Sequence, residues 1–144
     1  MKKTSIATLL LVALAGCATT PTGADRATAA IGDRLLAYQE KPQGPSGRIV
    51  VTRDSGFLGG QCFYAVSING KLAARLAVGE SATFYVEPGE ILLRSSRDPM
   101  GRGLCSVMSE ERTQRETIIR QDETKHFRLS IDANGKTDIQ RADK

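Results

Sequence analysis

Few side chains in this sequence are of the types that carry acid–base chemistry. The chain holds one histidine, His126, which alternates with Phe127 and Leu129 in a run of period two. Hydrolytic triads and histidine-based zinc sites need such a histidine beside partner groups. Its place in the run instead predicts a strand residue that faces solvent, opposite Phe127. A general base at this position is the less favoured interpretation.

Carboxylates offer two further kinds of site. Asp54, Glu87 and Glu90 would serve as an acid and base pair if the fold brought two of them about 5–10 Å apart in a cleft. The stretch from Asp132 to Asp138 resembles part of a calcium loop, but Lys136 stands where an oxygen ligand is needed, and a polar hairpin turn explains the same residues. The sequence therefore predicts a protein that is not an enzyme, with no metal and no cofactor.

A cysteine near the amino terminus is suited to covalent attachment of lipid. Lys2 and Lys3 precede a short apolar segment that ends in Leu14-Ala15-Gly16-Cys17. The segment is too short to span a hydrocarbon core of about 30 Å, and its last four residues resemble the lipobox of bacterial lipoproteins. The resemblance implies cleavage before Cys17 and acylation of the Cys17 thiol. An ordinary secretory signal peptide, with Cys17 incidental, is the alternative.

The residue after this cysteine bears on location. It is Ala18 and not Asp, which in lipoproteins of Gram-negative bacteria implies sorting to the outer membrane, with the domain facing the periplasm. Two or more acyl chains make anchoring stable. We therefore expect the membrane to be a partner through the amino-terminal lipid.

Length and charge limit the other partners. Removing residues 1–16 from the 144 leaves 128, which suits one domain with a single core. The chain has 20 Lys and Arg against 16 Asp and Glu, and the removed segment carries two of the lysines, so the mature chain has a net charge of about +2. Nucleic-acid binding needs a concentrated basic face, so no nucleic-acid partner is expected.

The two remaining cysteines form an even pair. Cys62 and Cys105 belong to a chain predicted to reach an oxidising compartment, where disulfides form and persist. Each falls on the inward side of an alternating run, Cys62 with Tyr64 and Cys105 with Val107. We predict a Cys62–Cys105 disulfide; two buried free thiols are the alternative.

The first part of the mature chain is predicted to be irregular and then helical. Residues 17–24, rich in Thr, Pro and Gly, are typical of a tether. Residues 25–41 are predicted to form a short helix capped by Asp25, because Ile31, Leu35 and Tyr38 recur at helical spacing. Prolines and glycines between residues 42 and 47 end it.

Residues 48–141 change to a period of two, in runs of five to seven residues separated by turn residues. Asn69-Gly70 and Asn134-Gly135 are typical of hairpins, and Pro88-Gly89 of a type II turn. A further strand is expected around Cys105. The fold class predicted is all-β: an antiparallel immunoglobulin-like β-sandwich of about seven or eight strands, with the short amino-terminal helix in front.

Part of this region resembles a known repeat. The segment from Tyr64 to Lys71, followed by Val86-Glu87-Pro88-Gly89-Glu90, resembles the PEGA-type repeat and uncharacterised proteobacterial lipoproteins of unknown function. The resemblance implies a small immunoglobulin-like sandwich. It also implies contact with cell-surface carbohydrate, without assigning that role to any residue.

A glycine-rich loop is the candidate contact surface. Phe57 and Leu58 are apolar, and Arg53 flanks them, a combination that suits a partner protein or a glycan if the loop is exposed. The alternative is that both side chains fold back and close one end of the sandwich. We therefore expect a membrane-anchored periplasmic lipoprotein, a non-catalytic binding or structural module of the cell envelope. The alternative function is an inhibitor or accessory subunit of an envelope enzyme or a secretion assembly.

Overall fold

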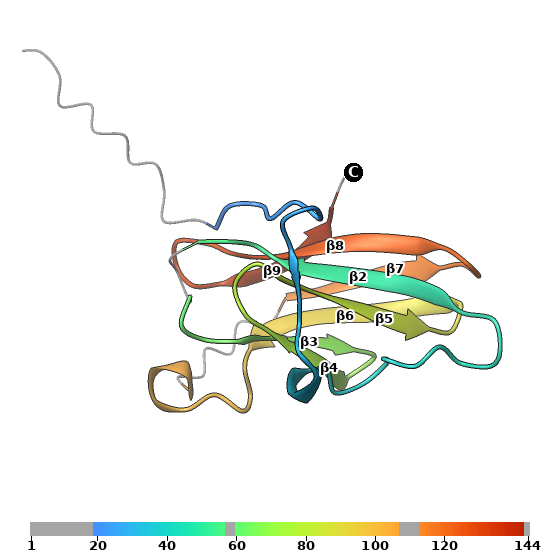
Figure 1. Ribbon diagram of the computed structural model, residues 1–144, viewed down its shortest axis with the longest axis horizontal. Helices are drawn as coiled ribbons and strands as arrows, with labels where there is room; N and C mark the ends of the chain where they lie inside the picture. The colour runs from blue at the N-terminus through green and yellow to red at the C-terminus, as the bar shows by residue number, and fades with distance from the viewer. Residues whose placement is uncertain (1–18, 57–59, 107–112, 143–144) are drawn as a thin grey trace, which may run out of the picture.

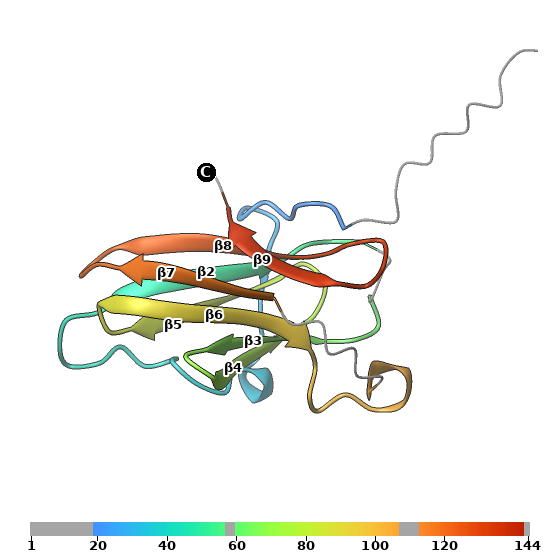
Figure 2. The ribbon, with the colours of Figure 1, turned by 180° about the vertical axis from the view of Figure 1, so that it is seen from behind.

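Two β-sheets pack face to face in the computed structural model, which describes residues 19–56, 60–106 and 113–142 (Figures 1 and 2). The five-stranded sheet has the order β1-β5-β2-β8-β9 and the four-stranded sheet the order β4-β3-β6-β7. The strands of the first are β1 (Thr28–Ala29), β2 (Gly47–Arg53), β5 (Glu80–Val86), β8 (Thr124–Ile131) and β9 (Thr137–Arg141). Those of the second are β3 (Tyr64–Ile68), β4 (Lys71–Leu76), β6 (Gly89–Arg97) and β7 (Thr113–Ile119). The all-β sandwich is confirmed.

The alternation of the sequence decides which side of each strand is buried. In β2, Gly47, Ile49, Val51 and Arg53 are buried while the residues between them are exposed or half-buried. Strands β5, β6 and β8 follow the same rule, as expected for sheets with one face on the core. The largest fully buried apolar side chains of this core are Tyr64, Phe84, Ile49, Ile68, Leu76, Leu93, Ile119, Leu129, Ile131 and Ile139.

The sandwich is not purely antiparallel as predicted. Strand β2 pairs with β8 in parallel and β1 with β5 in parallel, while the other pairs are antiparallel. A parallel pair needs a long connection, and here the chain enters the second sheet twice between β2 and β8, first for β3 and β4 and then for β6 and β7. Alternation within single strands carries no information on such long-range pairing.

The two predicted hairpins are present. Asn69 and Gly70 both have positive φ, 49° and 81°, in the β3–β4 turn, and Gly135, with φ of 81°, lies in the β8–β9 turn. The turn at Pro88-Gly89 instead leads from β5 in one sheet to β6 in the other. It is a crossing between layers and not a hairpin.

The predicted helix at residues 25–41 is absent. The segment contains strand β1 and a single 3-10 turn, η1 (Gly32–Arg34), and Tyr38 has a φ of 62°. Its backbone bonds go to the sheets: Ala30 N donates to Ser81 O and Leu36 N to Ala73 O. A short isolated helix is marginal in water, whereas these bonds cover the edges of β5 and β4, which would otherwise be open. Leu35 and Tyr38 pack on the core, and Ile31 is exposed.

Two further expectations need correction. The strand expected around Cys105 is a 3-10 turn, η2 (Gly103–Ser106), and Val107 lies outside the described residues. The segment expected to be a tether is seated on the sheet from Thr19 onward: Thr19 N donates to Ile131 O, and Thr20 forms a bridge with Ser55. Thr19 and Thr20 come close to Ile131 and Ser55 only in the folded chain, so these contacts cannot be read from the local sequence. Within the described ranges, no helix is long and apolar enough to cross a membrane.

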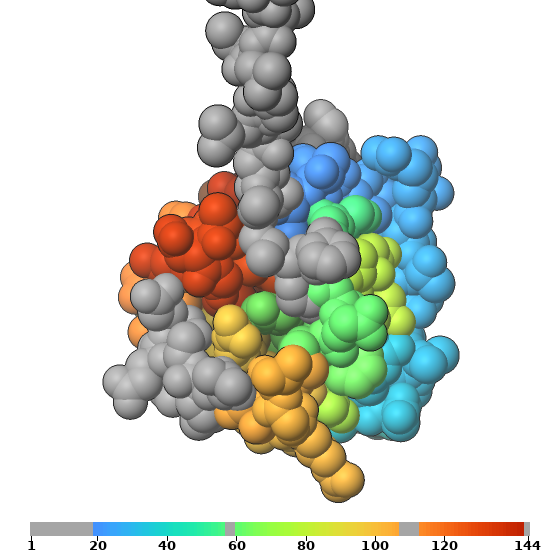
Figure 3. Space-filling view, turned by 90° about the vertical axis from the view of Figure 1, so that its left-hand side faces the viewer, coloured from blue at the N-terminus to red at the C-terminus, as the bar shows by residue number. Residues whose placement is uncertain are grey.

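The strand directions define two ends of the sandwich. At the loop end, β2, β4, β6 and β8 finish and β3, β5, β7 and β9 begin. It carries Thr19 and the described connections at residues 54–56, 60–63, 77–79, 98–106 and 132–136. The far end carries the strap at residues 38–46 and the turns at 69–70, 87–88 and 120–123. In Figure 1 the loop end lies on the left, and Figure 3 looks directly at it.

Candidate functional site

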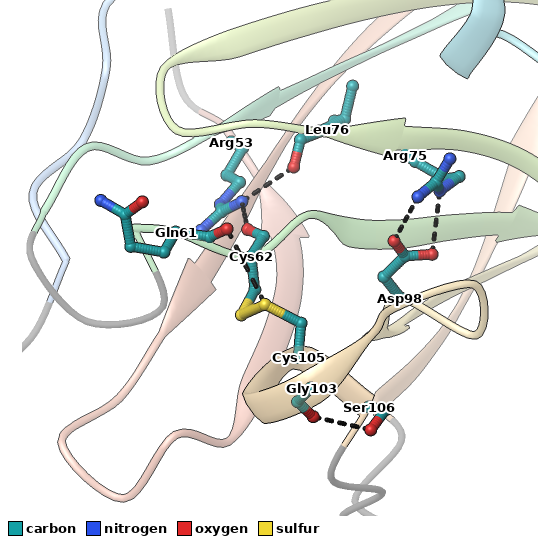
Figure 4. The surroundings of a disulfide bond; sticks show 9 residues. All are labelled: Arg53, Gln61, Cys62, Arg75, Leu76, Asp98, Gly103, Cys105 and Ser106. Carbon is teal, nitrogen blue, oxygen red and sulfur yellow. Dashed lines mark hydrogen bonds and ion pairs between the residues drawn. A yellow bond between two sulfur atoms is a disulfide. The ribbon is translucent and has the colours of Figure 1, made fainter.

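The loop end holds the predicted disulfide. Cys62 and Cys105 are bonded, with their Cα atoms 5.4 Å apart and 43 residues apart in sequence. The bond fastens η2 to the residues that lead into β3 (Figure 4). The disulfide is confirmed, but it joins two connections and not two strands of the core.

The contact hypothesis required Arg53 to lie beside an exposed loop, but its side chain is buried. Its side chain is 1 % exposed and reaches from β2 across the core, where Nη1 donates to Cys62 O at 2.6 Å and to Leu76 O at 2.8 Å. The guanidinium also stacks over the ring of Tyr64, 4.5 Å from its centroid. Burial lowers the pKa of Arg53 to about 10, against the opposite effect of Tyr64 and Glu80, so the side chain stays protonated at neutral pH.

Arg53 thus ties the two sheets together. Arg53 lies on the same face of β2 as the buried residues Ile49 and Val51, because side chains two residues apart in a strand point to the same side. This alternation was a sign of burial in the sequence, but the neighbouring glycine-rich loop suggested exposure instead. Phe57 and Leu58, the other two residues of the predicted contact loop, lie outside the described residues.

A second charged cluster surrounds Phe63, just before β3. The guanidinium of Arg34 lies 4.7 Å from the centroid of the Phe63 ring, and that of Arg75 lies 5.1 Å from it. Arg34 forms a bidentate pair with Glu80, and Arg75 a bidentate pair with Asp98 at 2.9 and 2.6 Å. Each cation is therefore neutralised while its flat face contacts the ring. We call these five residues the Phe63 cluster.

The cluster perturbs the titration of its own members. Burial pushes the pKa of Glu80 up, but the hydrogen bonds from Arg34 and from Ala77 N–H outweigh burial, so the pKa of Glu80 is lowered. The bond to Asp98 raises the pKa of Arg75, and the bond to Glu80 raises that of Arg34. At neutral pH Glu80 and the two arginines are therefore charged, which is the state their geometry needs.

Of the three carboxylates proposed as an acid and base pair, Asp54 lies at one end of the sandwich, whereas Glu87 and Glu90 lie at the other end and both line one groove there. Asp54 is buried at the loop end, where Arg128 binds it in a bidentate pair and Thr19 Oγ1 donates to it at 3.2 Å. Glu87 and Glu90 are exposed at the far end. Asp54 therefore has a structural partner and no carboxylate of this set beside it.

His126 lies on the outer face of a strand, and Asp132 lies in a hairpin turn, as predicted. His126 lies half-buried on the outer face of β8, in the wall of a groove of about 730 Å³ between that face and residues 21–24. Asp132 Oδ1 accepts hydrogen bonds from the backbone N–H groups of Asn134 and Lys136, as expected of a hairpin turn. Within the part of the chain that the structure describes, no group of three His, Cys, Asp or Glu side chains is placed to hold a metal ion.

The η2 connection presents apolar side chains to solvent. The side chains of Leu104 and Met100 are 87 % and 57 % exposed. The connection that carries them is nevertheless held in place at both of its ends. One end is held by the disulfide at Cys105. The other is held by Asp98, whose carboxylate accepts from Met100 N and whose carbonyl accepts from Gly101 N. Leu104 was missed from the sequence because a single apolar residue in a polar loop carries no periodic signal.

The far end has a groove of its own. It has a volume of about 480 Å³ and lies between the strap and the β5–β6 crossing. Two tyrosines, Tyr38 and Tyr85, and three glutamates, Glu40, Glu87 and Glu90, contribute to its lining. Aromatic faces beside carboxylates can stack on a sugar ring and accept hydrogen bonds from its hydroxyl groups. The sequence did not point to this groove, because Tyr38 was assigned to a helix.

Comparisons of the chain with protein-family models, with curated proteins and with solved structures found no match. The resemblance to lipoproteins and to the PEGA-type repeat therefore stays a prediction.

Proposed function

We propose that this protein is a lipoprotein of the cell envelope, anchored to the outer membrane through acylated Cys17, whose sandwich acts in the periplasm as a non-catalytic binding or structural module. The observation that supports this most directly is the seating of the amino-terminal segment. Thr19, two residues after Cys17, is hydrogen-bonded to Ile131 and Asp54 at the loop end. Two residues span at most about 7 Å, so an acylated Cys17 would hold the loop end close to the bilayer.

The disulfide supports export. Cys62 and Cys105 are bonded, and such bonds persist in oxidising compartments. The immunoglobulin-like assignment belongs to the same proposal and is supported by the two packed sheets and by the connections that cross between them.

The far-end groove is the binding surface that this arrangement favours. It lies at the opposite end from Thr19 and would point away from the membrane, toward other envelope components. Its tyrosines and glutamates suit a glycan or a protein segment that offers hydroxyl or amino groups.

Anchoring is tested in a Gram-negative host that expresses the full chain. We expect labelled palmitate to be incorporated and the protein to fractionate with outer membranes, and the Cys17→Ser variant to lose both. Equal fractionation of the two proteins, without label in either, would refute the anchor.

The binding role is tested by co-sedimentation with purified peptidoglycan and by photo-crosslinking from position 85, with position 114 on the exposed face of β7 as the matched control. We expect crosslinked envelope material from position 85 that is absent from position 114. The same products from both positions would count against the groove.

A further inference from the structure

The η2 connection and Thr19, the first described residue, lie at the same end of the sandwich. Thr19 is hydrogen-bonded to Ile131 and Asp54 at the loop end. Figures 1 and 2 show η2 at this same end, and in Figure 3 η2, in orange, projects at the lower edge of the face that the loop end presents. The sequence places Cys17 two residues before Thr19. A lipid on Cys17 would therefore bring this face, and not a side of the sandwich, against the bilayer.

The tip of η2 has the composition of a membrane-interface contact. Met100 and Leu104 are largely exposed, and Arg102, between them, is exposed as well. Apolar side chains of this kind bury well in the boundary between headgroups and acyl chains, and a neighbouring cation interacts favourably with lipid phosphates.

The apolar tip is held in place and is not a slack loop. Asp98 is buried, its carboxylate is paired with Arg75 in the Phe63 cluster, and it accepts from Met100 N. At the other side Cys105 is bonded to Cys62, and Cys105 N donates to Arg102 O. Two anchors that fix the base and leave Leu104 outside the core provide a preorganised contact, because little conformational freedom remains to be lost on binding.

We propose that η2 is a second membrane contact of the lipid-anchored protein: Met100 and Leu104 insert into the bilayer interface while Arg102 binds lipid phosphates. The proposal rests on the anchoring proposed above and adds to it the orientation of the domain. The lipid would fix one point of the loop end and η2 a second, which keeps the far-end groove directed into the periplasm.

Tryptophan fluorescence tests this contact directly, because the chain contains no tryptophan. We would make Leu104→Trp and, as the matched control, Ile118→Trp, which replaces an equally apolar residue that is 58 % exposed near the opposite end of β7. Both lipidated proteins would be reconstituted into phosphatidylethanolamine and phosphatidylglycerol vesicles, with and without brominated acyl chains. Flotation of the vesicles reports anchoring independently of fluorescence.

The contact predicts quenching of the tryptophan at position 104 by brominated lipid and a blue shift of its emission, because an interfacial side chain lies about 5–10 Å into the bilayer boundary. The tryptophan at position 118 should show neither. Replacing Arg102 with Glu in the Leu104→Trp protein should reduce the quenching, and more so in vesicles rich in phosphatidylglycerol.

The outcomes separate the two proposals. Protein that fails to float refutes the anchor. Protein that floats without quenching at position 104, or with equal quenching at both positions, refutes the η2 contact and leaves the anchor standing. A blue shift at position 104 that depends on concentration in unlipidated Cys17→Ser protein would assign the patch to a second copy of the chain and overturn the membrane contact.

Discussion

Removing the disulfide should weaken the whole fold. The bond joins residues that are 43 apart, and the loop that it closes contains β3, β4, β5 and β6. In the chain-entropy relation, closing a loop of that length in the unfolded chain stabilises the native state by about 4 kcal/mol. For a domain of this size that loss corresponds to a fall in melting temperature of roughly 12–16 °C.

The perturbation is the double variant Cys62→Ala/Cys105→Ala, compared with the oxidised protein by urea unfolding followed by circular dichroism. Both cysteines are half-buried, so loss of packing should add little. Wild-type protein in excess reductant is the control, and it should unfold at a similar urea concentration to the double variant because it has also lost the cross-link.

A loss below about 1 kcal/mol in the double variant would refute the reasoning, since the loop length sets the magnitude. A reduced wild type that stays as stable as the oxidised protein would have the same meaning. Either result would indicate that the unfolded chain is already restricted, or that the 98–106 connection unfolds locally without affecting β3 to β6.

Three further predictions concern the sheets and their charged ties. Gly47→Ala should destabilise the protein by about 2–4 kcal/mol, because a Cβ there would lie 2.2 Å from Ile119 Cγ2 and 2.7 Å from Arg120 O. The control is Gly32→Ala, which should leave the melting temperature nearly unchanged because no atom lies within 4 Å of the added carbon. Arg75→Leu should lower the free energy of unfolding in urea by about 3–5 kcal/mol, because it leaves the buried carboxylate of Asp98 unpaired. Arg115→Leu breaks the exposed pair with Asp138 and should cost no more than about 1 kcal/mol. Equal losses in the two variants would contradict the role of burial. The pKa of Glu80 is lowered in the folded state, so its contribution to stability is present above the unfolded value of 4.5 and disappears as the pH falls through the lower folded value. Glu80→Gln should therefore flatten the decline in stability below pH 4.5. An unchanged pH profile of stability in this variant would show that Glu80 contributes nothing to the decline.

The candidate site was only partly predictable, and particular residues show why. The cysteine count together with the prediction of export sufficed to pair Cys62 with Cys105. The composition of the glycine-rich loop made Arg53 a flank of an exposed contact surface, although its parity in β2 matched that of buried residues. Phe63 was not noticed, because the two arginines that stack on it come from positions 34 and 75, which only the fold brings together.

The error at residues 25–41 has a related cause. Helical spacing of three apolar residues is a local signal, and it is weak in a segment of this length. The edges of β4 and β5 offered backbone partners to the same segment. A long-range interaction therefore overrode a local preference.

Local patterns in the sequence by themselves determined the β-class, the core-facing residues of most strands, the turns at Asn69-Gly70 and Asn134-Gly135 and the pairing of the cysteines, because each depends on neighbours in the chain or on a count. The tertiary structure alone decided the parallel pairing of β2 with β8, the seating of residues 28–37 on the edges of β5 and β4, the burial of Arg53 and the convergence of Thr19 and η2 on one end. These features join segments tens of residues apart, and the free energy that selects them comes from packing and hydrogen bonding that exist only once both sheets have formed.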